Sequence, residues 1–330
     1  MIDLPRELED FIHDRLAAAD GKRVAAAALE LSQRYRALAP PRLDSPESVL
    51  AYATWMLPST HAQILGALRA IPLRVGEWRP RSLLDLGGGP GTAAWAATDI
   101  WPDIESVTVL DREPALLEFG RDAAAQSSSP ALREAKWLAA GLPGGVPRGQ
   151  SSLVILANVV SELGPTENPL VLRRAWEACD GVLVIVEPGT PPGFRAIEEA
   201  RRLMISLGAH VLAPCPHASA CPLAEAAPDW CHFSERHERP EFQRRVKDAS
   251  LPWEDAKVSF VVLARFESAG RPWARVLRHP WHAKGHADLR LCTEAGAADR
   301  TVARSAGAGW KLARKLEWGS AVEREQDLGA

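Results

Sequence analysis

A glycine-rich turn and a nearby carboxylate form the first set of residues that could do chemistry. The run Gly87-Gly88-Gly89-Pro90-Gly91 follows the apolar segment 82–86 and precedes the helical stretch 93–97. Between a strand and a helix, glycines let backbone N–H groups approach a ligand that side chains would block. Asp111 ends the next predicted strand, where a carboxylate can accept both hydroxyls of a ribose. This order of strand, turn, helix, strand and acid predicts a nucleoside-cofactor site.

Two cofactors compete for this geometry. A dinucleotide such as NAD places its pyrophosphate at the helix N-terminus and favours Gly-x-Gly-x-x-Gly. This chain has Gly-x-Gly-x-Gly, with Asp85 before the turn in position to receive a cationic group. S-adenosylmethionine carries such a group, and Asp-Leu-Gly-Gly-Gly-Pro-Gly-Thr resembles the first motif of class I S-adenosylmethionine-dependent methyltransferases. We therefore expect S-adenosylmethionine; a turn without ligand is the alternative.

The segment after the predicted strand 153–157 supplies one candidate contact and no catalytic group. Asn158 lies where such folds line the cofactor crevice, although it could instead cap the strand end. The run Asn158-Val-Val-Ser-Glu-Leu contains neither Asn/Asp-Pro-Pro-aromatic nor Pro-Cys. Glu162 or Glu187 could act as a base, but strand-end acids more often face solvent. Cofactor binding is predicted, and the catalytic residues are unknown.

Cysteines form the second candidate site. Three fall within seventeen residues and a fourth follows after a gap of sixty: Cys215, Cys221, Cys231 and Cys292. This spacing is not the Cys-x2-Cys of common zinc sites, but thiolates on loops also bind zinc or iron–sulfur clusters. We expect His217 and His232 to be neighbours of the site, with a ligand role as the alternative. Cys179, on a predicted helix before a strand, is expected to be a buried core thiol.

The elements that position these residues alternate between strand and helix. Predicted strands are 82–86, 107–111, 153–157, 181–186 and 258–264, and predicted helices are 93–97, 114–123, 169–178 and 196–206. This alternation predicts an α/β fold with a parallel, doubly wound sheet. The chain divides into an N-terminal helical region (1–75, interrupted at Pro40-Pro41), a central domain (76–268) with a Cys-rich, aperiodic insertion (212–250), and a basic, β-rich C-terminal region (269–330).

Composition excludes several classes of protein. With 46% hydrophobic and 25% charged residues the chain is globular, and a net charge of −3 gives no global attraction to nucleic acid. No apolar run approaches the roughly 18 residues of a membrane span, so we expect no membrane partner. Four acids in the first ten residues argue against a secretory signal or organelle presequence and predict a cytoplasmic location. The five cysteines do not indicate a disulfide framework. We expect a monomer.

The C-terminal region has a local excess of positive charge. From Arg271 to Trp318, ten Lys and Arg stand against four acids, with Trp273, Trp281, Trp310 and Trp318 interleaved. Such a segment could follow phosphates and stack on bases. A small β-rich lid with a solvated basic face is the alternative.

Several motifs together resemble one family. They are Asp85-Leu-Gly-Gly-Gly-Pro-Gly, Val186-Glu-Pro-Gly-Thr-Pro, Cys215-Pro-His, Cys221-Pro, Asp229-Trp-Cys-His-Phe and Val261-Val-Leu-Ala-Arg. From about Tyr52 to Trp318 the chain is similar to the methyltransferase-like assembly factors of the mitochondrial small ribosomal subunit and their bacterial homologues.

The resemblance implies a class I methyltransferase-like (Rossmann-like) domain, a [4Fe–4S] cluster and association with the immature small ribosomal subunit. By position, the cluster ligands would be Cys215, Cys221, Cys231 and Cys292. The residues that match the S-adenosylmethionine site are Asp85, Gly87, Gly88, Gly89, Gly91 and Asp111. Because the four thiolates also suit zinc, the spacing leaves the metal open. The early acids separate this chain from the mitochondrial members and favour a bacterial relative.

Two classes of function follow from the resemblance and the basic C-terminal region. The chain would either methylate ribosomal RNA or bind it without catalysis during assembly of the small subunit. A small-molecule methyltransferase is disfavoured by the basic, Trp-containing segment.

Overall fold

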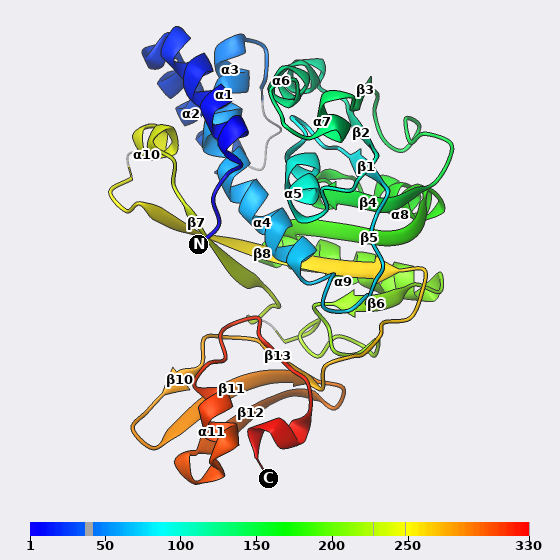
Figure 1. Ribbon diagram of the computed structural model, residues 1–330, viewed down its shortest axis with the longest axis vertical. Coiled ribbons are helices and arrows are strands. Elements are labelled where there is room, and N and C mark those ends of the chain that lie inside the picture. Colours follow the sequence, from blue (N-terminus) through cyan, green and yellow to red (C-terminus); the bar gives the residue numbers. More distant parts are fainter. Residues whose placement is uncertain (37–41, 227, 248, 330) are drawn as a thin grey trace.

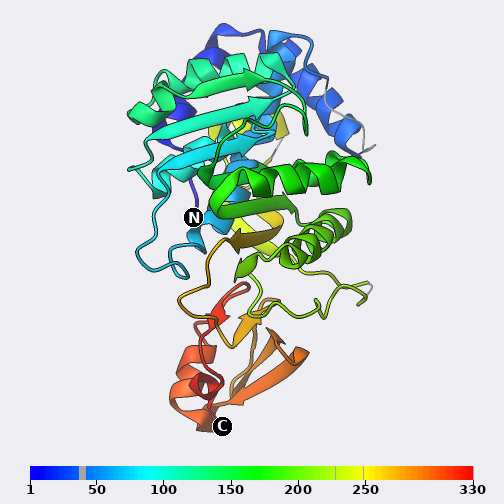
Figure 2. The ribbon, with the colours of Figure 1, turned by 90° about the vertical axis from the view of Figure 1, so that its right-hand side faces the viewer.

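Two sheets lie toward opposite ends of the long axis of the molecule (Figures 1 and 2). The computed structural model describes residues 1–36, 42–226, 228–247 and 249–329, so the expected break at Pro40-Pro41 lies outside the described residues. The helices are α1 Arg6–Ala18, α2 Gly21–Arg36, α3 Pro46–Trp55, α4 Leu57–Arg69, α5 Thr92–Ile100, α6 Pro114–Ala124, α7 Pro130–Arg133, α8 Glu167–Glu177, α9 Pro191–Ser206, α10 Glu241–Lys247 and α11 Ala308–Ala313, with short 3-10 turns at Val160–Glu162, Arg304–Ala306 and Glu325–Leu328. The strands are β1 Ser82–Leu86, β2 Ser106–Asp111, β3 Lys136–Ala139, β4 Ser151–Ala157, β5 Cys179–Pro188, β6 His210–Ala213, β7 Phe233–Glu238, β8 Trp253–Ala264, β9 Ala274–Val276, β10 Trp281–His282, β11 His286–Thr293, β12 Gly296–Ala303 and β13 Ala321–Val322.

The larger sheet has the order β3-β2-β1-β4-β5-β8-β6, and β7 also pairs with β8. The strands from β3 to β5 are parallel, whereas β8 runs antiparallel to β5, β6 and β7. The predicted doubly wound α/β fold is confirmed, but the sheet is mixed rather than wholly parallel. The cause is the length of β8: its first half pairs with β7 and its second half inserts between β5 and β6.

Side chains alternate between two helical layers along the central strands. Leu83 and Val184 face a core shared with α4 and α5, whereas Leu84 and Ile185 face a core shared with α8 and α9. Because successive side chains of a strand point to opposite faces, a strand covered on both sides reads as an uninterrupted apolar run. This burial fixes the carboxyl ends of the strands, where the glycine-rich turn follows β1.

The smaller sheet has the order β10-β11-β9-β13, with β12 paired to β11. Its residues form a hydrophobic core of their own beneath α11, which confirms the expected β-rich C-terminal region. The N-terminal helices are confirmed as α1–α4. No helix within the described ranges is long and apolar enough to cross a membrane.

Two expectations about local structure were wrong. The segment 212–250, expected to lack regular structure, contains β7 and α10, because β7 gains its hydrogen bonds from the distant β8 rather than from a local pattern. Cys179 begins β5 rather than ending a helix. Its thiol is nonetheless fully buried, as expected of a core residue.

Candidate functional site

The glycine turn is a backbone cradle at the carboxyl end of β1. Gly87, Gly89 and Gly91 have φ angles of +70°, +52° and +77°, which favour glycine. The amides of Gly87 and Gly88 donate to the carbonyl oxygen of Leu110, at 2.7 and 3.1 Å. From β1 the chain continues to β2 and β3 on one side, whereas β4 and β5 lie on the other side of β1. The turn therefore lies at the point where the strand order reverses, and open α/β sheets bind their ligands there.

Asp85 lies beneath this turn with no partner for its charge. Its side chain is fully buried, and neither carboxyl oxygen has a hydrogen-bond partner among the described residues. Burial, with a contribution from Asp111, raises the pKa of Asp85 to about 8. A Cβ atom at Gly88 would lie 2.5 Å from the Asp85 carboxyl group, so only glycine leaves room there. An unpartnered buried carboxyl group is costly, and a cationic ligand would supply the missing partner.

Asp111 holds the turn in place from the end of β2. One of its carboxylate oxygens accepts from the amide of Gly89 and the other from the amide of Glu113, both at 2.8 Å. Each oxygen keeps a further lone pair, so a ribose could still bind there. The role in ribose binding stays a prediction.

Asn158 shares this edge of the sheet. Its φ is +58°, an uncommon value for a residue other than glycine, and strained backbone of this kind clusters at ligand sites. Its side-chain amide donates to Thr60 Oγ1 on α4 at 3.5 Å, while its carbonyl oxygen Oδ1 has no partner among the described residues. Thr60 escaped the sequence analysis because nothing in its helix links it to β4.

Glu187 does not face solvent, contrary to the expectation for a strand-end acid. It is fully buried and accepts from the amides of Val160 and Ser161, at 2.7 and 3.2 Å, and from the Ser161 hydroxyl group. Burial raises the pKa of Glu187 to about 7. Its position at the end of a buried strand explains this bonding, which fixes the chain after β4. Glu162 is exposed, as expected, and lies 4.0 Å from Arg112.

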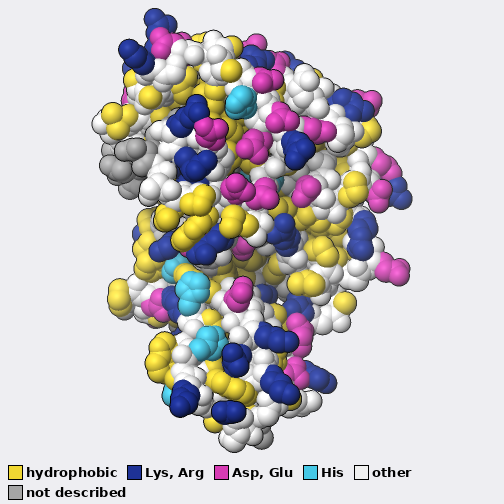
Figure 3. All heavy atoms as spheres, turned by 60° about the vertical axis from the view of Figure 1, so that its left-hand side comes forward, with side chains coloured by type: hydrophobic (Ala, Val, Ile, Leu, Met, Phe, Trp, Pro, Cys, Tyr) yellow, Lys and Arg dark blue, Asp and Glu magenta, His cyan; other side chains and the backbone are white. Residues whose placement is uncertain are grey.

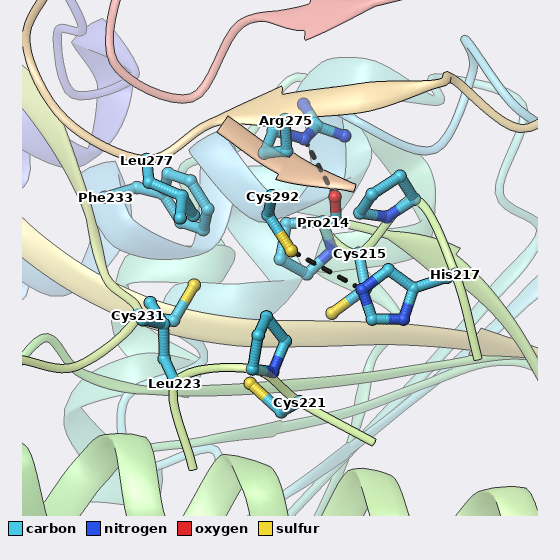
Figure 4. A pocket seen from close by; sticks show the side chains of 12 residues that line it. Pro214, Cys215, His217, Cys221, Leu223, Cys231, Phe233, Arg275, Leu277 and Cys292 are labelled. Atoms are coloured by element: carbon cyan, nitrogen blue, oxygen red, sulfur yellow. Dashed lines mark hydrogen bonds between the residues drawn. The ribbon is translucent and has the colours of Figure 1, made fainter. Parts of the chain in front are cut away.

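The four predicted cysteines line one cavity between the two sheets (Figure 4). The cavity is small, about 20 Å³, and partly open to solvent. Three of the cysteines come from the loops between β6 and β7, and the fourth from β11 of the smaller sheet: Cys215, Cys221, Cys231 and Cys292. Fold topology thus brings together residues that lie up to 77 positions apart in sequence.

Burial and mutual repulsion oppose ionisation of three of these thiols. Burial, then the neighbouring Cys215 and Cys221, raise the pKa of Cys292 to about 12, and the pKa values of Cys221 and Cys231 are raised in the same way. Among the described residues no group of three or more His, Cys, Asp or Glu side chains is arranged to hold a metal ion.

The two histidines near the cysteines differ in position. His217 lines the cavity, is buried, and places Nε2 3.5 Å from the Cys292 sulfur. The ring of His232 instead stacks on Trp230, with ring centroids 4.8 Å apart, and contacts the edge of Trp318. Two arginines contact the cysteine loop, the buried Arg201 and the half-buried Arg275. The sequence did not point to them, because isolated arginines form no motif.

Of the four tryptophans in the basic segment, Trp281 alone is exposed, and its ring contacts that of His286. Its side chain is 59% exposed, whereas Trp273 and Trp310 pack against the core of the smaller sheet. Trp318 meets the rings of His232 and His279, at centroid distances of 4.7 and 5.0 Å. Structural packing therefore accounts for three of the four.

Basic side chains gather on the surface of the smaller sheet (Figure 3). Those that are exposed and form no salt bridge with a described residue are Arg271, Lys284, Arg304, Lys311, Arg314 and Lys315. Others are neutralised, since Arg290 pairs with Asp299 at 3.0 Å and Arg278 pairs with Asp229. The charge available to a ligand is smaller than the composition predicts.

Known proteins that are similar to this chain occur in human and in Schizosaccharomyces pombe. The human ribosome assembly protein METTL17, mitochondrial, is 28% identical over 290 residues, which cover 82% of this chain and 61% of that protein. The Schizosaccharomyces pombe Rsm22-cox11 tandem protein 2, mitochondrial, is 27% identical over 335 residues, 84% of this chain and 43% of that protein. The chain thus spans 61% and 43% of the length of these two relatives. Among solved structures it is similar to the Synechocystis magnesium protoporphyrin IX methyltransferase with bound S-adenosylmethionine, at 10% identity and a TM-score of 0.41, over 78% of this chain and 97% of that one.

These matches overturn the predicted bacterial, cytoplasmic location. Both relatives are mitochondrial proteins, and so is the family that matches. The acidic residues at the start of the chain misled the prediction of location, because the composition of ten residues does not indicate the family to which the chain belongs. The matching family, described as mitochondrial small ribosomal subunit Rsm22, aligns with residues 46–323 and so includes the glycine turn and all four cavity cysteines. The chain belongs to this Rsm22 family.

Proposed function

We propose that this chain is a methyltransferase-like protein of the small ribosomal subunit that binds S-adenosylmethionine and holds an iron–sulfur cluster on four cysteines. Family membership over residues 46–323 carries the ribosomal part of the proposal. The proposed role is either methylation of ribosomal RNA or assistance in assembly of the subunit, as the name of the human relative suggests.

The unpartnered carboxyl group of Asp85 is the main support for S-adenosylmethionine. It lies under the glycine turn at the carboxyl end of β1, and the ammonium group of the cofactor would supply its missing partner. Asp111 and Asn158 would bind the ribose and line the crevice. When bound, the cofactor supplies an electrophilic methyl group. The chain's own residues hold the cofactor and exclude water from its charged end.

Four cysteines around one cavity support a metal centre, and the resemblance to the family favours an iron–sulfur cluster over zinc. Four thiolates suit either metal centre, since one zinc ion binds four thiolates at about 2.3 Å each and a [4Fe–4S] cluster also takes four cysteines. The thiols reach the cavity from the loop between β6 and β7 and from β11 of the smaller sheet. The residues that would hold the cluster are Cys215, Cys221, Cys231 and Cys292.

Ribosomal RNA is the proposed partner of the exposed basic side chains around Trp281. An exposed Trp can stack on an unpaired base, and Lys284 on the same hairpin can contact a phosphate. Trp281→Ala should weaken binding of a single-stranded RNA by about 1–3 kcal/mol in a fluorescence titration. Trp273→Phe, in the core of the same sheet, is the control. Equal affinity of both variants would refute the stacking role.

Non-catalytic assembly is the second candidate, and the surroundings of Glu187 favour it. The one buried acid at the end of β5 is already bonded to the backbone after β4, and so it is not free to take a proton from a substrate. The proposed enzyme would need a base elsewhere along the crevice, with exposed Glu162 as the remaining acid that the sequence suggested.

Two experiments test these proposals. Calorimetry with S-adenosylmethionine, S-adenosylhomocysteine and NAD should show binding of the two sulfur compounds; binding of NAD alone would refute the cofactor. Purification of the protein from its source cells, with comparison of ribosomal RNA modification with and without the gene, separates the two roles. Loss of one methylated nucleotide selects the enzyme, and accumulated precursor subunits with unchanged methylation select the assembly factor. Recovery of no ribosomal RNA, with neither effect, would end the ribosomal proposal.

A further inference from the structure

Two arginines contact the loop that carries Cys215, the buried Arg201 and the half-buried Arg275. Arg201, on α9, is 4% exposed, and its Nη2 donates to the carbonyl oxygens of His217 and Ser219, both at 2.8 Å. Arg275, on β9, lines the cavity itself (Figure 4). Its Nε donates to the carbonyl oxygen of Pro214 at 2.8 Å. Together they hold the loop from the main domain and from the smaller sheet.

Neither arginine has a carboxylate partner among the described residues. Two neighbouring arginines do form salt bridges: Arg74 pairs with Glu323 at 2.8 Å, and Arg278 pairs with Asp229. Arg201 and Arg275 bond to neutral carbonyl oxygens instead. The Nε of Arg201 has no partner within the described chain. Burial and the charge of Arg74 lower the pKa of Arg275 to about 10, so it stays charged at neutral pH.

Buried charges without counter-charges are expensive, and proteins pair them. Both arginines lie beside the cavity cysteines. Arg275 lines the cavity and stands opposite Cys292 in the pairing of β9 with β11, and Arg201 bonds the loop between Cys215 and Cys221. The facing acids are few: Glu198 lies near Cys221, Glu294 lies near His217, and Glu323, which pairs with Arg74, lies near Arg275. Two fixed positive charges thus face four thiols.

We propose that Arg201 and Arg275 are the counter-charges of an anionic four-thiolate centre in this cavity. This inference rests on the proposed metal site and adds that the metal with its four thiolates carries a net negative charge. Four thiolates around either a divalent zinc ion or an oxidised [4Fe–4S] core of charge +2 give a net charge of −2, which two guanidinium groups balance. The arginines are positioning residues: they fix the loop and stabilise the ionised ligands, and they do not bind the metal.

The test measures how firmly the centre is held. Wild-type protein, Arg201→Gln, Arg275→Gln and the double variant are purified anaerobically, and metal release to excess chelator is followed. Each single variant should lose its metal about 10- to 100-fold faster than wild type, since groups behind metal ligands carry effects of that size. Arg275→Lys keeps the charge without the planar fork and should lie near wild type. Equal release by wild type and both Gln variants would overturn the proposal.

Arg265→Gln is the matched control. This arginine also donates to backbone carbonyl oxygens, those of Cys179 and Trp176, but it lies away from the cavity. It should release metal at the wild-type rate. If Arg275→Lys loses metal as fast as Arg275→Gln, the role is hydrogen bonding alone and the charge assignment is wrong.

If the centre is an iron–sulfur cluster, a second measurement isolates charge. One-electron reduction by dithionite adds a negative charge to the site, so removing a nearby cation should shift its midpoint potential to more negative values. Each Gln variant should show this shift, and Arg265→Gln should not. Wild-type protein without any metal would refute the proposed site and this inference together, whereas a metal-containing wild type with unaffected variants refutes the inference alone.

Discussion

The glycine turn takes its shape from one unbroken stretch of chain, whereas the cysteine cavity joins segments that lie far apart in the sequence. The turn is complete without a ligand: its amides bond to Leu110, and Asp111 holds it from below. Only Asp85 is left unpartnered. The cavity collects four thiols and lies beside two arginines that form no salt bridge with a described residue. Loss of the ligand should therefore leave the turn intact but weaken the junction between the two sheets.

We expect the junction between the two sheets to depend most on Cys292 of the smaller sheet. Cys292 and Leu277 pack against Phe194 and Leu223 of the larger domain in a small shared core. A metal bound to Cys292 and to the loop cysteines would cross-link this core. Its removal would leave the Arg74–Glu323 pair among the remaining contacts, and a partly exposed pair of this kind contributes little.

The largest effect is therefore expected from Cys292→Ser. This variant should lose its bound metal completely, since one of four ligands is gone, and its smaller sheet should become sensitive to proteolysis. Metal content and the rate of limited digestion measure the two effects. Cys179→Ser is the control, because this thiol is buried in the main sheet away from the cavity. Loss of metal from the control but not from Cys292→Ser would exclude the assigned ligand set.

Gly88→Ala should give the next largest effect, which should be confined to the proposed cofactor site at the glycine turn. The new Cβ atom would lie 2.5 Å from the Asp85 carboxyl group and 2.7 Å from Val109, so one of them must move. Strain of about 1–3 kcal/mol should weaken binding of S-adenosylhomocysteine by about 10- to 100-fold. Calorimetry measures the affinity. Metal content should remain unchanged, because the glycine turn and the cysteine cavity are independent sites. A simultaneous loss of metal would show that the two sites are coupled.

Gly144→Ala is the matched control for this substitution. No atom lies within 4 Å of a Cβ built at Gly144, and its backbone does not require glycine. Its affinity for S-adenosylhomocysteine should equal that of wild type. An equal loss in both variants would mean that Gly88 has no special place in the site.

The same contrast explains what the sequence could predict. The strand 82–86, the turn and Asp111 were all predictable, because one local pattern of apolar run, glycines and acid contains them. Their roles as ligands remain predictions. The set of four cysteines was also identified, but from family resemblance and not from spacing. No local pattern could place Cys292 beside Cys215, since β11 and the loop meet only after both sheets have formed.

Long-range contacts also account for what was missed. β7 has no strong apolar alternation of its own and exists because β8 supplies its hydrogen bonds. Arg201 lies on a helix whose sequence reads as amphipathic, and its carbonyl partners lie 16 and 18 residues away. Glu187 was misjudged as exposed because its bonds to Val160 and Ser161 depend on the pairing of β4 with β5.

The smallest effect expected is a dependence of cofactor affinity on pH, set by Asp85. Burial raises the pKa of Asp85 from 3.8 to about 8, so the carboxyl group of the free protein is protonated at pH 6. An ammonium group favours the ionised form, and binding of S-adenosylhomocysteine must therefore expel this proton. Below a pKa of about 8, affinity should rise with pH, by up to about tenfold between pH 6 and pH 7. Over this range the amino group of the ligand stays protonated.

Asp85→Asn separates this mechanism from a general effect of pH. The amide cannot ionise, so its affinity for S-adenosylhomocysteine should be low and nearly the same at pH 6 and pH 7. Stability should change in the opposite sense. The raised pKa means that folded wild type keeps a proton that the unfolded chain releases, so its stability falls as pH rises from 3.8 to about 8. The melting temperature of the variant should therefore exceed that of wild type by a margin that grows from pH 5 to pH 8. A margin independent of pH would show that the pKa of Asp85 is not raised in the folded protein, and the buried, unpartnered carboxyl group would then not explain binding of a cationic ligand.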